Sequence, residues 1–132
     1  MKTLLSRMFA LLLVMVVGLM GCTSTPSGLS GNYREDVLSV VTGLRTAITL
    51  PNDSPDKMAA QAQARELIND FSSLYRRNTS VTKLSSFTTM RTALNSLAGH
   101  YSSYPNRPVP EKLKKRLEQE FAQIESALKR GS

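Results

Sequence analysis

The sequence predicts an all-α protein, an up-down antiparallel four-helix bundle that follows a cleaved signal peptide and a flexible lipidated tether. Two observations predict the bundle. Apolar residues recur at helical spacing in four segments after residue 31, and no segment has a convincing strand pattern. The third observation is the N-terminus, whose order of basic, apolar and polar residues is typical of an export signal.

The first 21 residues have the layout of a secretory signal peptide. Lys2 and Arg7 form a basic head, and the 13 residues from Met8 to Met20 carry no charge. A membrane-spanning helix needs roughly 20 apolar residues, so a permanent transmembrane anchor is not expected. We therefore expect residues 1–21 to be removed, which leaves 111 of the 132 residues.

The stretch Leu19-Met20-Gly21-Cys22 resembles the bacterial lipobox, in which the cysteine becomes the new N-terminus and carries the lipid. Cys22 is the single cysteine of the chain. The alternative is an ordinary signal peptide with an incidental cysteine. We predict lipidation of Cys22 and a polar tether over residues 22–31, which are rich in Ser, Thr, Gly and Pro.

Composition excludes several classes of function. One lipidated cysteine leaves no thiol for a disulfide, a redox pair or a nucleophile. Without Lys2 and Arg7, 15 basic residues remain against 10 acidic ones, which favours an acidic protein surface or anionic headgroups as partners. Nucleic acid is not expected, because aromatic residues are not interleaved with the basic ones. The length allows one domain, over residues 32–132.

The first helix is predicted to start after Asn32, a capping residue with Glu35 in the capping-box position. Leu50 and Pro51 end it, because proline restricts the residue before it and has no N–H of its own. The apolar stripe consists of Tyr33, Val37, Val40, Val41, Leu44, Ala47 and Ile48.

The second helix is predicted to open at Ser54, with Pro55 at the first helical position and Asp56 at the positive end of the helix dipole. Arg76 and Arg77 close it. Its predicted buried face consists of Ala60, Ala64, Leu67, Ile68, Phe71, Leu74 and Tyr75.

The third helix is predicted to be capped by Thr79 or Ser80 and to fray over residues 99–103. Three prolines within residues 105–110 then predict a stiff, extended connector. The inner face of this helix is expected to consist of Leu84, Phe87, Met90, Leu94, Leu97 and Tyr101.

The fourth helix, from Pro110 and Glu111, has the clearest pattern, with spacings of four, four, three and four. Its apolar residues are Leu113, Leu117, Phe121, Ile124 and Leu128. Basic residues fill its first turns, where cations oppose the helix dipole. This placement suggests that they bind something outside the helix, and the alternative is a solvated helix face. The basic residues are Lys112, Lys114, Lys115 and Arg116.

No catalytic or cofactor motif is present in the sequence. The single histidine, His100, is more typical of a helix-end contact than of a metal ligand. Glu118 and Glu120 are two residues apart on a helix and face different ways, so they do not form a carboxylate pair. Tyr101 and Tyr104 are typical of packed rings with hydrated hydroxyls. We expect a non-catalytic protein with no cofactor and no bound metal.

Four stretches of the chain, residues 31–36, 64–70, 85–101 and 104–117, resemble one known family. The most specific parts are Phe-Thr-Thr-Met at 87–90 and Asn-Arg-Pro-Val-Pro-Glu-Lys-Leu-Lys at 106–114. The family is the small luminal lipoprotein that assists assembly and repair of photosystem II. The resemblance runs from about Leu29 to Arg130 and includes the lipobox. Cys22 favours the cyanobacterial branch, because the chloroplast relatives have transit peptides and no lipid cysteine.

This resemblance implies a function. Members of the family bind transiently to immature photosystem II at the lumen-side loop of its chlorophyll-binding inner antenna subunit. They hold off the extrinsic subunits while the manganese cluster is assembled. The resemblance also implies a monomer, anchored by lipid on the luminal side of the thylakoid membrane. The competing interpretation is a periplasmic lipoprotein that binds an envelope component or a small ligand inside the bundle.

We predict the partner-binding surface at the junction of the third and fourth helices. It combines a rigid connector, which loses little entropy on binding, with tyrosine and arginine, which are favoured at interface hot spots. Helix-end packing and solubility are the alternative roles of these side chains. The predicted residues are His100, Tyr104, Asn106, Arg107, Lys112, Lys115 and Arg116. In the core, we expect Phe87, Leu94, Phe121 and Ile124 to be buried.

Overall fold

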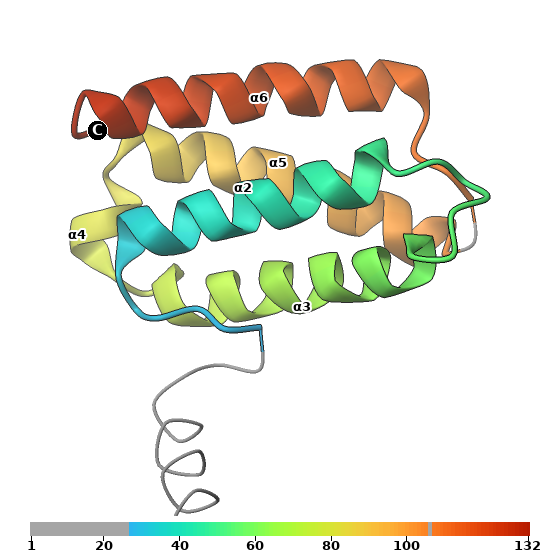
Figure 1. Ribbon diagram of the computed structural model, residues 1–132. Helices are drawn as coiled ribbons and strands as arrows, with labels where there is room; N and C mark the ends of the chain where they lie inside the picture. The colour runs from blue at the N-terminus through green and yellow to red at the C-terminus, as the bar shows by residue number, and fades with distance from the viewer. Residues whose placement is uncertain (1–26, 106) are drawn as a thin grey trace, which may run out of the picture.

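The computed structural model describes residues 27–105 and 107–132, which contain helices and no strand (Figure 1). The signal peptide, the lipobox with Cys22, and Asn106 lie outside the described residues. None of the described helices combines the length and the hydropathy needed to cross a membrane. The helices are α2 (Tyr33–Thr49), α3 (Lys57–Tyr75), the short α4 (Thr79–Thr82), α5 (Ser85–Ser103) and α6 (Glu111–Lys129).

The four long helices form an up-down antiparallel bundle, as predicted. In Figure 1, α2 and α5 run in one direction, and α3 and α6 run in the other. Each long helix packs against two others, with α2 next to α3 and α6, and α5 next to α6 and α3. The closest pairs are α2 with α3 and α5 with α6, so the bundle consists of two helical hairpins packed face to face.

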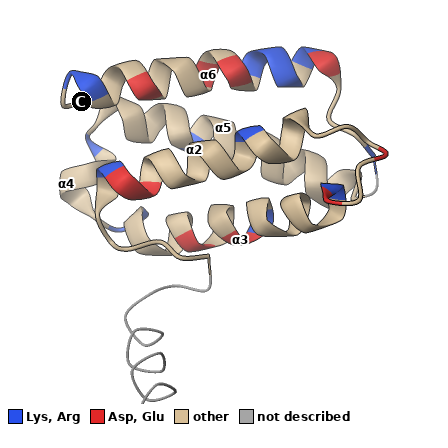
Figure 2. Cartoon of the chain, viewed as in Figure 1, with Lys and Arg blue, Asp and Glu red and all other residues tan. Residues whose placement is uncertain are grey.

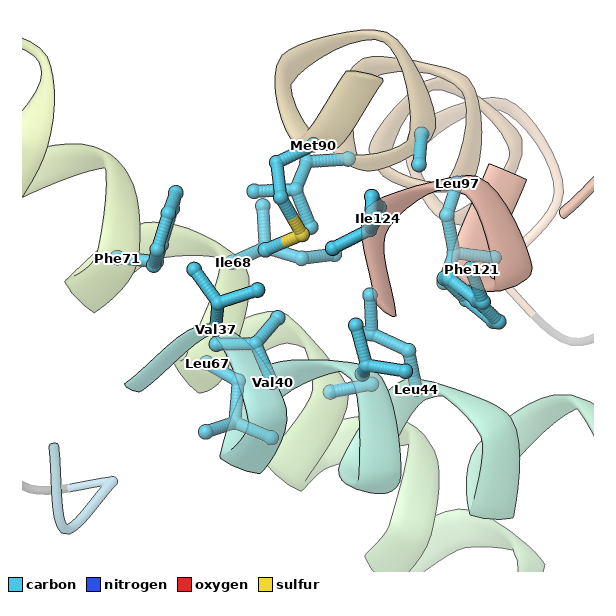
Figure 3. Packing of buried hydrophobic residues seen from close by; sticks show 14 of the residues in the cluster. Val37, Val40, Leu44, Leu67, Ile68, Phe71, Met90, Leu97, Phe121 and Ile124 are labelled. Atoms are coloured by element: carbon cyan, nitrogen blue, oxygen red, sulfur yellow. The ribbon is translucent and has the colours of Figure 1, made fainter. Parts of the chain in front are cut away.

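The core lies between the four long helices (Figure 3). The four residues predicted at its centre, Phe87, Leu94, Phe121 and Ile124, are all buried, which confirms the predicted stripes of α5 and α6. Leu74 is a correction. It was expected on the buried face of α3, but 38% of it is exposed. Leu74 is rotated by about 100° from the buried Tyr75, which places it at the edge of the buried face near the end of α3.

Both ends of α2 lie where the sequence predicts them. The Asn32 side-chain oxygen accepts a hydrogen bond from the backbone N–H of Glu35 (3.2 Å), and Leu50 adopts an extended conformation before Pro51. The start of α6 is also confirmed, with Pro110 as the residue before its first turn.

The start of α3 differs from the prediction. Residues 54–56 form a turn, so the helix begins at Lys57 rather than at Pro55, and no side chain caps it. Lys57 is 7% exposed, and its ammonium group donates to the carbonyl oxygens of Ala47 (2.6 Å) and Leu50 (2.9 Å) at the end of α2. The turn brings Lys57 over the unpaired carbonyls of α2, a tertiary contact that capping rules do not include.

The third predicted helix is divided in two, which corrects the expectation of one helix from Thr79 or Ser80. Asn78 caps the short α4 by accepting from the backbone N–H of Ser80 (3.2 Å). Leu84 is extended (φ −76°, ψ 142°) and separates α4 from α5. The predicted fraying over residues 99–103 is also wrong, because α5 continues to Ser103 and the N–H of Tyr104 still donates to the carbonyl of His100 (2.8 Å).

Residues 27–31 pack on the bundle, which shortens the tether predicted for residues 22–31. Leu29 is 1% exposed and belongs to the core. The Asp36 carboxylate, 2% exposed, accepts from the backbone N–H groups of Ser30 (2.8 Å) and Gly31 (2.9 Å) and from the hydroxyl of Tyr75 (2.5 Å). The composition of this segment is that of a linker, but Leu29 and the hydrogen bonds to Asp36 pack it on the bundle.

Candidate partner-binding surface

Three of the predicted partner-binding residues meet where α5 ends. The His100 Nε2 atom lies 3.2 Å from the Arg107 carbonyl oxygen, and the His100 ring centroid lies 5.6 Å from that of Tyr104. The Arg107 guanidinium lies over the Tyr104 ring, 5.6 Å from its centroid, a cation–π geometry. We call His100, Tyr104 and Arg107 the connector cluster. Tyr104 is 49% exposed, so the cluster presents an aromatic ring and a cation to solvent.

The local sequence explains why this cluster forms. Tyr104 leaves helical geometry (φ −135°, ψ 67°), and the N–H of Arg107 donates to its carbonyl (3.2 Å), so the chain turns back toward α5. Val109, 4% exposed, inserts into the core and ties the connector to the bundle. The prolines at 105, 108 and 110 restrict the backbone between these points. The connector therefore opens with a turn between Tyr104 and Arg107, where the sequence predicted an extended backbone, and Val109 joins it to the core.

The other predicted residues lie on α6. Lys112, Lys115 and Arg116 are exposed on its first turns, at the end of the helix that adjoins the connector (Figure 2). Arg116 is partly compensated, because its Nε donates to Glu120 at 3.0 Å, one helical turn away. The unfavourable position of this cation near the start of the helix is thus offset within α6. Lys112 and Lys115 therefore support binding to an outside partner more strongly than Arg116 does.

The structure also brings together residues that the sequence analysis missed. A hollow of about 210 Å³ between α3 and α5 is lined by two arginines, Arg76 and Arg91, and by apolar residues that include Phe71, Phe87 and Leu94. The sequence signal was available, since α5 carries Arg91 and no carboxylate. Only the packing of α3 against α5 places the two arginines at one hollow.

A second hollow, of about 280 Å³, lies nearer the connector and is lined by Arg65 and Tyr101 among others. The Arg65 guanidinium lies over the Tyr101 ring at 5.4 Å from its centroid. Burial raises the pKa of Tyr101 to about 12, so its phenol stays protonated at neutral pH and is no base there. In residues 27–105 and 107–132, no three His, Cys, Asp or Glu side chains gather as a metal site would require.

Comparisons with known proteins show which family the chain resembles. The profile of the family described as "Photosystem II Pbs27" matches residues 5–128. The "Photosystem II assembly factor lipoprotein Psb27" of Thermosynechococcus vestitus is 59% identical over 130 residues, which cover 98% of this chain and 97% of the relative. The "Photosystem II lipoprotein Psb27" of Synechocystis is 55% identical over 130 residues, covering 98% and 96%.

A plant relative and a solved structure extend the comparison. The "Photosystem II repair protein PSB27-H1, chloroplastic" of Arabidopsis thaliana is 33% identical over 100 residues, covering 75% of this chain and 58% of the relative. The solution structure of Psb27 from cyanobacterial photosystem II is 54% identical, covers 83% of this chain and 95% of its own, and superposes with a TM-score of 0.76. These relatives are named as an assembly factor, a lipoprotein and a repair protein, and none is named as an enzyme. The resemblance found in the sequence is thus confirmed, and the chain belongs to the Photosystem II Pbs27 family.

Proposed function

We propose that this protein is a non-catalytic, monomeric assembly and repair factor of photosystem II, anchored by lipid at Cys22 to the luminal side of the thylakoid membrane. The observation that carries the proposal is the 59% identity, over nearly the full length of both chains, to a protein named as a photosystem II assembly factor lipoprotein. The stretch Leu19-Met20-Gly21-Cys22 supports the anchor, since it has the order of a lipobox.

In this role the protein binds transiently to immature photosystem II, at the lumen-side loop of the inner antenna subunit. It holds off the extrinsic subunits while the manganese cluster is assembled. The support is the sequence resemblance given above, together with the physics of anchoring. A tethered bundle has a high effective concentration near a membrane-embedded target, so modest contacts suffice for binding and a small interface is released easily.

We propose that the connector cluster, Asn106 and the exposed basic residues of α6 form the contact with this partner. Tyrosine and arginine side chains on a rigid backbone lose little conformational entropy when they bind. Lys112, Lys115 and Arg107 give the surface a positive character that suits an acidic loop. The rim charges should act mainly on the rate of encounter and on its dependence on salt.

The test is a double charge reversal, Arg107→Glu with Lys115→Glu. Pull-down from solubilised thylakoids should recover less photosystem II core with this variant than with the parent protein. The residual binding should fall less steeply as salt is raised, because two attractive charges are gone. The matched control is Lys129→Glu with Arg130→Glu, which makes the same charge change on exposed residues at the other end of α6.

Equal recovery by the Arg107 and Lys115 variant and the parent, across the whole salt series, would place the contact surface elsewhere on the bundle. Equal losses in the test and the control variants would mean that net charge, and not this surface, governs binding. Failure of the parent itself to recover any photosystem subunit would reject the proposed function.

A further inference from the structure

The described chain begins over the groove between α2 and α3. The backbone N–H of Ser27 donates to the Asp70 carboxylate of α3 (3.1 Å), and the Gln63 side chain donates to the Ser27 carbonyl (3.5 Å). Leu29, two residues on, is buried in the core, so this exit point is fixed to the bundle. Figure 1 shows the segment passing from the start of α2 across α3. Ser27 itself lines the groove, together with Leu38, Ser39, Thr42, Gly43, Gln63 and Leu67.

The residues that line this groove are uncharged, and Asp70, which accepts from Ser27, is a charged neighbour. Arg45, the one charged residue of α2 after Asp36, is turned to α6, where it bonds Glu118 (3.1 Å) and Glu125 (2.7 Å). On α3, residues 58–64 carry no charge, and the first carboxylates come further along that helix. In Figure 2, α2 after its first turn and the first half of α3 are mostly tan, while blue and red recur along α6. We call the following exposed residues the uncharged face: Leu38, Ser39, Thr42, Thr46, Met58, Ala59, Ala62 and Gln63.

The length of chain between Cys22 and Ser27 limits how the bundle sits on a membrane. Five peptide units separate the two residues. A fully extended chain spans at most about 3.5 Å per residue, so Cys22 lies within about 17 Å of Ser27. Two layers of helices, each about 10 Å across, make a bundle roughly 20 Å thick. Cys22 itself therefore does not reach past the far side of the bundle, formed by α5 and α6.

We propose that the uncharged face lies against the lipid headgroups when the protein is anchored. This inference rests on the proposed lipidation of Cys22. Charged groups that approach the low-dielectric part of a bilayer lose hydration, and a face without lysine or arginine avoids that loss. Leu38 is 40% exposed and Met58 is 80% exposed. Moving apolar side chains from water to the membrane interface lowers their free energy, so these two residues favour the contact. The outward sides of α5 and α6 then face the aqueous lumen.

Tryptophan fluorescence tests this orientation, because the natural chain contains no tryptophan. Thr42→Trp places the probe on the uncharged face, and Ala122→Trp is the matched control on the exposed side of α6. Each lipidated mature protein is reconstituted into phosphatidylcholine vesicles whose acyl chains are brominated close to the headgroup. We expect severalfold stronger bromine quenching for Thr42→Trp than for Ala122→Trp. Leu38→Trp provides a second probe of the same face if circular dichroism shows that Thr42→Trp does not fold.

Equal quenching of the two probes, or stronger quenching of Ala122→Trp, overturns the orientation while the lipid anchor stands. Absence of the lipidated parent from the vesicle fraction after flotation rejects the anchor itself, and the orientation with it. Unlipidated Cys22→Ser carrying the Thr42→Trp probe should show little quenching. Strong quenching in that protein would mean that the face binds lipid without the anchor. It would overturn the proposal that lipidation of Cys22 brings this face to the membrane.

Discussion

Lys57 illustrates how a single charged residue is accommodated in this core. Its ammonium group is removed from water, which lowers its pKa, and the nearby Lys114 lowers the pKa further. In return it donates to the carbonyls of Ala47 and Leu50, which lie at the end of α2 and lack helical partners. The side chain thus caps one helix from the first residue of the next, and its aliphatic stem fills space between them.

At the same scale, Phe121 is the most informative core position to truncate. It is fully buried, and the Arg45 guanidinium lies 5.4 Å from its ring centroid. Phe121→Ala should lower the free energy of unfolding by roughly 3–5 kcal/mol, because the substitution removes apolar contacts and leaves a cavity. Urea denaturation followed by circular dichroism measures this, with exposed Ala122→Ser as the control. A loss below about 1 kcal/mol would be inconsistent with the packing described for α6.

At the scale of elements, the bundle depends on how closely α2 and α3 approach. A Cβ atom built on Gly43 would lie 2.3 Å from a methyl carbon of Leu67, so the glycine permits this close packing. The break between α4 and α5 has a related cause, since Val81 of α4 is buried at 7% exposure and Leu84 turns the chain into α5. The first contact brings the two helices of one hairpin together, and the second connects that hairpin to α5.

The junction of the N-terminal segment with α2 and α3 depends on Asp36. Asp36→Ala leaves the hydroxyl of Tyr75 and the N–H groups of Ser30 and Gly31 without their acceptor. We expect a loss of about 2–5 kcal/mol in the free energy of unfolding, because buried donors without partners are costly. Thermal and urea unfolding measure the loss, and exposed Glu35→Ala is the neighbouring control. Equal stability of the two variants would show that the hydrogen bonds to Asp36 contribute little to the stability of this junction.

At the scale of the whole molecule, buried phenols predict how stability responds to alkali. Burial raises the pKa of Tyr33 and Tyr75, in Tyr75 together with its bond to Asp36, and raises that of Tyr101 to about 12. The unfolded chain releases these protons near pH 10. Because the folded pKa is the higher one, the stabilisation is fully present below pH 10 and is lost as the pH rises toward 12.

Urea midpoints measured from neutral pH to about pH 11 should therefore fall once pH 10 is passed. Absorbance at the phenolate wavelength should show that ionisation of these residues accompanies unfolding. Tyr101→Phe removes one of the raised groups, so its midpoint should fall less steeply than that of the parent. An unchanged slope in Tyr101→Phe, or a parent midpoint that stays constant through pH 11, would contradict this linkage.

The anchor is also a property of the whole molecule, since it sets where the bundle resides. Cys22→Ser should release much of the protein from washed membranes, because several acyl chains, each buried CH₂ contributing about 0.8 kcal/mol, are lost. Fractionation and mass spectrometry of the mature N-terminus measure the effect. Unchanged mass and unchanged membrane retention in this variant would refute the lipobox interpretation.

Much of the fold followed from sequence alone, because apolar spacing and capping are local properties of the chain. The stripe of α6, with Phe121 and Ile124 at its centre, and the ends of α2 are of this kind. The candidate surface was partly accessible in the same way. Three prolines and the residues His100, Tyr104 and Arg107 lie within one short stretch, so their position at the junction of two helices was a local prediction, whereas their mutual contacts were not predicted.

What only the tertiary structure decided involves residues far apart in sequence. The bond from the N–H of Ser27 to Asp70 joins residues 43 positions apart, and together with the buried Leu29 it converts part of an expected tether into a packed segment. The split of the third helix and the cap from Lys57 likewise depend on neighbouring elements. Composition and period describe each segment by itself, whereas buried hydrogen bonds are satisfied between segments, so they emerge only once the helices have packed.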